Sequence, residues 1–401
     1  MQIARIAGSM LGIATVLFTL TTYHSTILAG VVTFASIVPG LLVSPVAGAL
    51  LDRHGRSRLV VLDYLIGMLS LILIGILALA DALPAPLLIL IAAISSLTGP
   101  LSATGLRSLF PVIVPRHLWE RMNAVDSTGF VAASIVGPPV AAALVATVGG
   151  PVALIAIGLA FGLAAVVMVG IREPVTTVAT TGSLLRDAWL GLRYTLGNPT
   201  LRGLGAAIST LNLAGGMLTI LIPVIVIERL GLGEIVVGAV FAIEGLGGIV
   251  AASVVGRIDT RGRERALIAL PMFAFAAAFA VLLIPAGLWA VIVALLVIGI
   301  TNGPIDVAMF TLRQRRTDPR WTGRAFAVSM SLNYVGSPIG SALAGWLIAA
   351  SFEASVGVAI VASVLAGIFA LRLIPSTPAA ASSPAASSPA APSPAAPSTG
   401  D

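Results

Sequence analysis

The chain has 401 residues, 58% of them hydrophobic and 9% charged, and its mean hydropathy is +1.08. Soluble domains carry about 25% charged residues, so this composition excludes a soluble fold and indicates a membrane protein. The formal net charge of +6 does not indicate a nucleic-acid partner, because the basic residues lie in short loops between apolar runs.

Twelve apolar runs are long enough to cross a bilayer, which takes about 20 helical residues. They cover residues 3–23, 27–51, 59–80, 84–109, 122–148, 151–171, 204–227, 231–255, 266–283, 289–312, 325–350 and 355–373. The ninth and tenth runs nearly merge around residues 285–287. A cleaved signal peptide is the alternative for the first run, but eleven further runs follow it and no convincing cleavage site is present.

We therefore predict an all-α membrane protein whose twelve transmembrane helices form two six-helix bundles, at residues 1–171 and 200–374. Residues 172–199 join them, and apolar positions at helical spacing predict an amphipathic helix there, with a flexible linker as the alternative. Residues 375–401 are nearly all Ala, Ser and Pro, so we expect a disordered tail.

The arginines predict how the chain is oriented. When the amino terminus is placed inside the cell, every basic residue except Arg229 falls on the inner side or at the inner end of a span. Positive charge is retained on the cytoplasmic side of membranes. We expect a multi-pass protein of the plasma (inner) membrane with both termini in the cytoplasm.

Cysteine is absent, and the three histidines, His24, His54 and His117, are far apart in the sequence. Disulfides and thiol chemistry are therefore excluded, and we expect no metal site and no cofactor. No nucleophile–base pair indicates an enzyme.

An arginine-rich loop occurs once in each half. The loop after the second span contains Gly48, Asp52, Arg53, Gly55 and Arg56. After the eighth span the pattern returns as Asp259, Gly262 and Arg263, with Thr260 in place of the first arginine. Repeated halves with matching loops are typical of secondary transporters.

The first loop resembles the hallmark G-x-x-x-D-R-x-G-R-[RK] loop of the major facilitator superfamily. The resemblance covers residues 1–374 and implies that family's fold, in which two halves alternately expose a central cavity. It also implies that the loop acts as a latch between the halves in the outward-facing state. A set of solvated charges that only fix the topology is the alternative reading.

A finer resemblance is to the exporters of macrolides, siderophores and other drugs, which include drug–proton antiporters. Residues 106–126 resemble the segment joining the fourth and fifth helices of those proteins. Gly137 and Pro138 are similar to the start of the antiporter motif G-P-x-x-G-G, although Ala141 and Ala142 replace its paired glycines. Pro138 is expected to bend its helix; ordinary packing of small residues is the alternative.

Carboxylates within spans are candidates for carrying protons. Glu244 lies near mid-membrane, where loss of water favours a protonated carboxyl group. We expect proton coupling there, with a hydrogen-bonded structural acid as the alternative. Asp306 could bind a proton or the substrate, or pair with Arg313 or Arg316.

Two further acids lie near the inner ends of spans. For Asp126, an ion pair beside Arg121 is favoured over a role in carrying protons. Asp63 is interpreted as an interfacial ion-pair partner.

Polar side chains within the spans are candidates for contacting a substrate: Asn212, Asn302 and Asn333. Hydrogen bonds between helices are the alternative. The remaining cavity is expected to be apolar, which suits lipophilic or weakly basic compounds.

These features together predict a monomeric, proton-coupled exporter of small amphiphilic molecules. Its expected partners are the substrate, protons and the lipid bilayer. An uptake symporter for a metabolite is one alternative, and a membrane scaffold or sensor that transports nothing is another.

Overall fold

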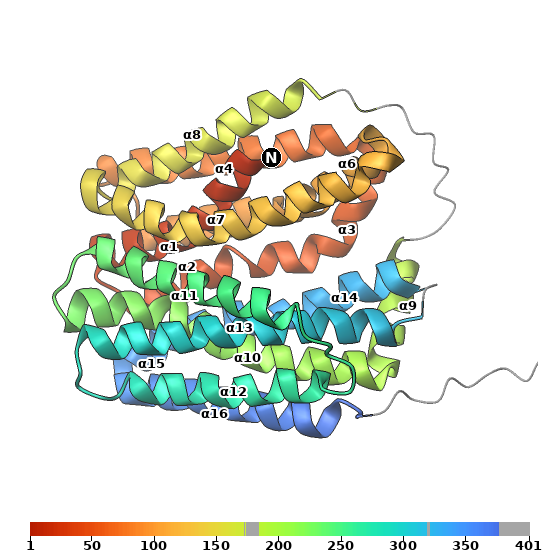
Figure 1. Cartoon of the computed structure of the whole chain (residues 1–401). Helices are drawn as coiled ribbons and strands as arrows, with labels where there is room; N and C mark the ends of the chain where they lie inside the picture. Colours follow the sequence, from red (N-terminus) through yellow and green to blue (C-terminus); the bar gives the residue numbers. More distant parts are fainter. Residues whose placement is uncertain (172, 174–183, 319–320, 377–401) are drawn as a thin grey trace, which may run out of the picture.

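The computed structural model describes the chain except residues 172, 174–183, 319–320 and 377–401 (Figure 1). Within some helices the side chains are not described either. Residues 377–401 of the expected disordered tail and residues 172 and 174–183 of the linker lie outside the described residues. Every regular element in the described part is a helix.

The amino-terminal half contains the first six predicted spans. Its helices are α1 (Gln2–Tyr23), α2 (Thr26–Ala35), α3 (Val38–His54), α4 (Arg56–Leu79), α5 (Ala85–Ser96), α6 (Gly99–Ile113), the short 3-10 helix Arg116–Leu118, α7 (Trp119–Val148) and α8 (Gly150–Val169). Two spans are broken: the second into α2 and α3, and the fourth into α5 and α6. A proline lies in the first turn after each break, where its missing N–H costs no hydrogen bond.

The carboxyl-terminal half begins after the linker. Helix α9 (Leu184–Gly197) lies within the linker, and the helices of this half are α10 (Pro199–Pro223) with its π-helical end Val224–Arg229, α11 (Glu234–Val255), α12 (Glu264–Val281), α13 (Leu288–Arg316), α14 (Thr322–Tyr334), α15 (Gly336–Ala350) and α16 (Phe352–Leu373). The ninth and tenth spans are separate, because Gly287 takes a φ of 61° before α13. The linker also contains a helix, α9, as one of the two sequence-based alternatives predicted.

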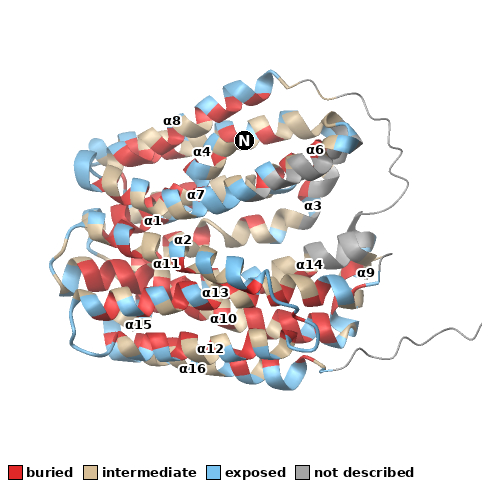
Figure 2. Cartoon of the chain, in the orientation of Figure 1, coloured by how far each residue is buried: buried red, intermediate tan, exposed pale blue. Residues whose placement is uncertain are grey.

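Eleven helices in the described chain are long and apolar enough to cross a membrane. The remaining predicted span is the eleventh, which is interrupted at Val335 between α14 and α15. Large apolar side chains are exposed on the outer helices, such as Val166 and Val169 on α8, which are 72% and 70% exposed. Figure 2 shows exposed positions along α8. A surface of this kind suits lipid rather than water.

The two halves touch mainly through two pairs of spans, α2 with α15 and α7 with α11. Thr26 Oγ1 donates a hydrogen bond to the carbonyl oxygen of Gly345 at 3.1 Å. A Cβ on Gly238 would lie 2.7 Å from Cα of Pro139, so the α7 and α11 backbones are in close contact. These contacts lie towards the end of the bundle away from α9, which we call the distal end (Figure 1).

At the other end, the α9 end, the same spans are arranged differently. Here α3 and α14, the continuations of α2 and α15, each pack against α9. The aromatic ring of Tyr194 on α9 stacks on Trp321 with ring centres 5.0 Å apart. The amide N–H of Asp318 also donates to the Tyr194 hydroxyl at 2.9 Å. Helix α9 therefore contacts both halves.

Candidate functional site

The arginine-rich loop of the first half is tied to the end of α8. Gly55 joins α3 to α4 with a φ of 89°, a conformation that favours glycine. Glu173 Oε2 accepts hydrogen bonds from the Ser57 amide at 3.0 Å and the Ser57 hydroxyl at 3.3 Å. Arg56 Nη1 donates to Glu173 Oε1 at 3.5 Å. A carboxylate at the start of α4 also interacts favourably with the helix dipole.

Sequence reasoning did not identify Glu173 as part of this loop. Gly48 lies within α3, but the side chains of Asp52 and Arg53 lie outside the described residues. In the second half, Gly262 again has a positive φ, 74°. Asp259 Oδ1 accepts from the Arg261 amide at 3.1 Å, which stabilises the turn locally, and Arg263 is exposed.

Glu244 and Asn302 are brought together on neighbouring helices. Asn302 Nδ2 on α13 donates to Glu244 Oε1 on α11 at 3.4 Å. The helices approach closely here, since a side chain at Gly299 would collide with the backbone of Glu244. The next residue, Gly245, faces Ile135 of α7, so Glu244 lies beside the contact between the halves.

Asp306 lies one turn beyond Asn302 on α13 and is exposed. Asp306 forms no ion pair within the described part of the chain, with Arg313 and Arg316 included. Asp306 therefore stays a candidate for binding a substrate or a proton.

Asp126 is buried and forms an ion pair with Arg5 of α1. Arg5 also donates a hydrogen bond to the carbonyl oxygen of Asp126. The side chain of Arg121 lies outside the described residues. This pair joins α7 to α1 within the amino-terminal half.

Asn212 and Asn333 connect three helices of the second half. Asn212 Nδ2 on α10 donates to the carbonyl oxygen of Asn333 on α14 at 2.8 Å. With its amide oxygen turned towards α13, Asn333 accepts from Arg313 Nη2 at 2.7 Å. Asn333 is buried, so these bonds favour a structural role for both asparagines.

Helix α7 continues through Pro138 and Pro139 as a single helix. Gly137 packs on Ser9 of α1 so closely that a Cβ would not fit. On the other side of α7, Gly238 of α11 contacts Pro139. The Gly137–Pro138 motif therefore lies between α1 and the contact between the halves.

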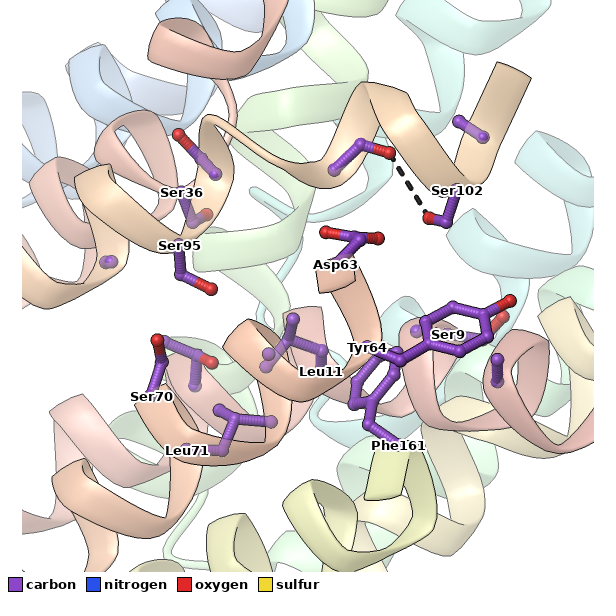
Figure 3. A pocket seen from close by; sticks show the side chains of 18 of the residues that line it. Ser9, Leu11, Ser36, Asp63, Tyr64, Ser70, Leu71, Ser95, Ser102 and Phe161 are labelled. Atoms are coloured by element: carbon purple, nitrogen blue, oxygen red, sulfur yellow. Dashed lines mark hydrogen bonds between the residues drawn. The ribbon is translucent and has the colours of Figure 1, made fainter. Parts of the chain in front are cut away.

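A cavity of about 590 Å³ lies inside the amino-terminal half (Figure 3). Its lining residues come from α1, α2, α4, α5, α6, α7 and α8. Asp63 of α4 projects into it near Ser36, Ser95 and Ser102. The ion pair expected for Asp63 is not formed among the described residues, so that expectation was wrong. In the same part of the chain, no three His, Asp or Glu residues gather as a metal site.

The family assignment agrees with this architecture. The model of the Major Facilitator Superfamily matches residues 3–341 and 262–398. The chain belongs to the major facilitator superfamily. Proteins of this family and their structural neighbours are transporters rather than enzymes.

Named relatives cover nearly the whole chain. The uncharacterized MFS-type transporter y4rN of Sinorhizobium fredii is 38% identical over 381 residues, covering 94% of each chain. The multidrug efflux pump Tap of Mycobacterium tuberculosis is 30% identical over 363 residues, covering 86% of this chain and 84% of Tap. The crystal structure of a mutant nucleoside transporter NupG superimposes with a TM-score of 0.72 at 12% identity, covering 93% of this chain and 99% of that one. That structural likeness concerns the fold alone.

Proposed function

We propose that this transporter is a proton-coupled exporter of small amphiphilic molecules. Similarity to a multidrug efflux pump over 86% of the chain supports export of drug-like compounds.

Alternating access follows from where the halves touch. Close backbone contacts join α2 to α15 and α7 to α11 at the distal end. The α9 end carries the arginine-rich loops and faces the cytoplasm under the positive-inside rule. The close contacts at the distal end support a conformation that opens towards the α9 end, and in our proposal the halves rock about these contacts to expose the substrate on the other side.

The Glu244–Asn302 pair is the observation that carries the proposal of proton coupling. A charged Glu244 accepts the hydrogen bond from Asn302, and protonation removes the charge that holds this pair. The adjacent Gly245 packs on Ile135 of α7. A change in the Glu244–Asn302 hydrogen bond therefore occurs directly beside the interface between the halves.

Transport in inside-out vesicles tests this function. Vesicles acidified inside by respiration should accumulate lipophilic dyes from a panel, and a protonophore should abolish the accumulation. We expect Glu244→Gln to fold normally and to lose the gradient-driven component. The matched control is Glu234→Gln, in the first turn of the same helix, which should retain it.

Other results would reject specific parts of the proposal. Dye accumulation that is unchanged by the protonophore would reject proton coupling. Unchanged transport by Glu244→Gln would reject a role for that residue in coupling. Substrate extrusion from inside-out vesicles identifies an uptake protein instead.

A further inference from the structure

The cavity of the amino-terminal half separates two parts of the apolar core. On one side are Leu71, Ile74 and Leu88, which belong to the large core cluster. On the other are Tyr64 and Leu106, which belong to a small cluster between α4, α6 and α8. Its volume of about 590 Å³ falls in the range of about 300–1,000 Å³ that holds drug-sized ligands.

The charges around this cavity leave one carboxylate in excess. Arg5 lies in the wall, but its guanidinium is committed to Asp126. The hydroxyl groups of Ser102 and Thr98 lie beside Asp63. No described cation lies within ion-pair distance of Asp63. A carboxylate within the membrane-spanning part of a protein is costly without a cation, and a positively charged ligand would offset that cost.

The wall of the cavity also contains the hydroxyl group of Tyr64. The Tyr64 side chain lines the cavity and is 2% exposed, and its hydroxyl has no hydrogen-bond partner among the described residues. Because this oxygen is itself closed off from the cavity, a ligand meets the ring of Tyr64 rather than its hydroxyl group.

Aromatic rings complete the wall. Tyr64 and Phe161 lie with ring centres 6.0 Å apart, at an interplanar angle of 43°. Phe130 lies at an exposed part of the lining, as do Gly8 and Ala103. Ring faces attract organic cations and pack against aromatic substituents.

We propose that this cavity binds monovalent organic cations bearing aromatic groups, with the positive charge facing Asp63 and the rings against Tyr64 and Phe161. The site lies within one half of the transporter rather than between the halves. As a cargo site it rests on the proposed export function, although binding can be measured without transport.

Two probes of matched shape and opposite charge test the role of Asp63. Binding of tetraphenylphosphonium and tetraphenylborate to the purified full-length protein is measured by equilibrium dialysis. We expect Asp63→Asn to weaken binding of the cation at least tenfold and leave the anion unaffected, whereas Asp63→Glu retains the cation. The control Asp81→Asn removes the same charge from an exposed loop whose φ of 51° asparagine tolerates.

A steric test locates the site. A Cβ on Gly8 or on Gly12 of α1 meets nothing within 4 Å, but only Gly8 lines the cavity. We expect Gly8→Phe to reduce cation binding at least tenfold and Gly12→Phe to leave it unchanged. Loss of binding in Gly12→Phe with none in Gly8→Phe would place the cation outside this cavity and overturn the proposal.

Transport assays on the same variants separate the two proposals. A cation that binds through Asp63 and Gly8 but is not exported supports the site and rejects the export function. Export with equal cation affinity in wild type, Asp63→Asn and Gly8→Phe rejects the site alone. Absence of cation binding by wild type also rejects the site.

Discussion

Asn302 Nδ2 lies 3.4 Å from Glu244 Oε1, and this hydrogen bond joins α13 to α11 beside the interface of the two halves. Removing the donor with Asn302→Ala should lower gradient-driven efflux several-fold. Interhelical hydrogen bonds in membranes contribute only about 0.6 kcal/mol on average, so thermal stability should change little. Efflux and the melting temperature measured on one preparation distinguish the two effects.

The neighbouring variant Thr301→Val is the control for Asn302→Ala. The Thr301 hydroxyl donates to the Ile298 carbonyl within its own helix, so its loss leaves the α11–α13 pair intact. Equal loss of efflux in both variants would show that the site tolerates no change at all, rather than that the bond to Glu244 matters.

Glu173 should stabilise the start of α4 through its bonds to Ser57 and Arg56. Glu173→Ala removes a helix cap, which typically costs about 1 kcal/mol, and should lower the melting temperature and transport together. Glu173→Gln keeps an acceptor for the Ser57 amide and should be milder. For comparison, Glu353→Gln breaks the exposed pair with Arg229 at 3.3 Å and should change little. A large effect of Glu353→Gln with none of Glu173→Ala would contradict this account.

The two glycines of the repeated loop should differ in their sensitivity. Alanine is strained at both positions, because both have positive φ. A Cβ on Gly55 would also touch Glu173 Oε2 at 3.6 Å, an ordinary van der Waals contact beside the bonds that hold the loop, whereas no described atom lies within 4 Å of a Cβ on Gly262. We expect Gly55→Ala to damage transport more than Gly262→Ala, and substitutions at Asp52 more than at Asp259. Dye-efflux rates normalised to protein amount measure this difference. Equal losses of efflux in the first-half and second-half variants would contradict the predicted asymmetry between the loops.

Gly238 allows α11 to close on α7, so Gly238→Ala should shift the protein towards the state that is open at the distal end. A Cβ there would lie 2.7 Å from Pro139 Cα and 2.8 Å from Ala142 Cβ. Spin labels at Thr147→Cys and Ile235→Cys report the distance across this contact, and the cysteine-free chain makes the labelling specific. We expect a longer distance than in the parent.

Gly357→Ala provides the comparison, because the added methyl group on α16 meets nothing within 4 Å. Its distance distribution should match that of the parent. An unchanged distribution in Gly238→Ala would mean that this contact does not set the equilibrium.

The family fold could be predicted because long apolar runs and one-sided arginines depend only on local sequence. The breaks in the second, fourth and eleventh spans were not predicted, since hydropathy stays high through them. Each broken span contains glycine and proline near its break. Pro39 follows the break in the second span and Pro100 follows the break in the fourth. These residues were the sequence feature from which the breaks could have been predicted.

Contacts between residues that are far apart in the sequence could not be predicted in the same way. Glu244 and Asn302 were each identified from their depth in a span, but nothing in the sequence shows that they meet. The same holds for Glu173 with Ser57, and for Arg5 with Asp126. The cavity near Asp63 depends on small residues from several helices, such as Gly8 and Ser70, whose common location only the fold reveals.

Asp63 and Glu244 lie in different halves of the molecule, and this separation constrains how an exporter of cations would work. A pump with one carboxylate couples its cargo to the proton by direct competition for that group. Here both could be bound at once, so each would alter the other's affinity only through the shape change that links the halves, and by the same factor in both directions. Loosening the α7–α11 contact would then produce a leak, with cations and protons crossing independently, instead of an inactive protein.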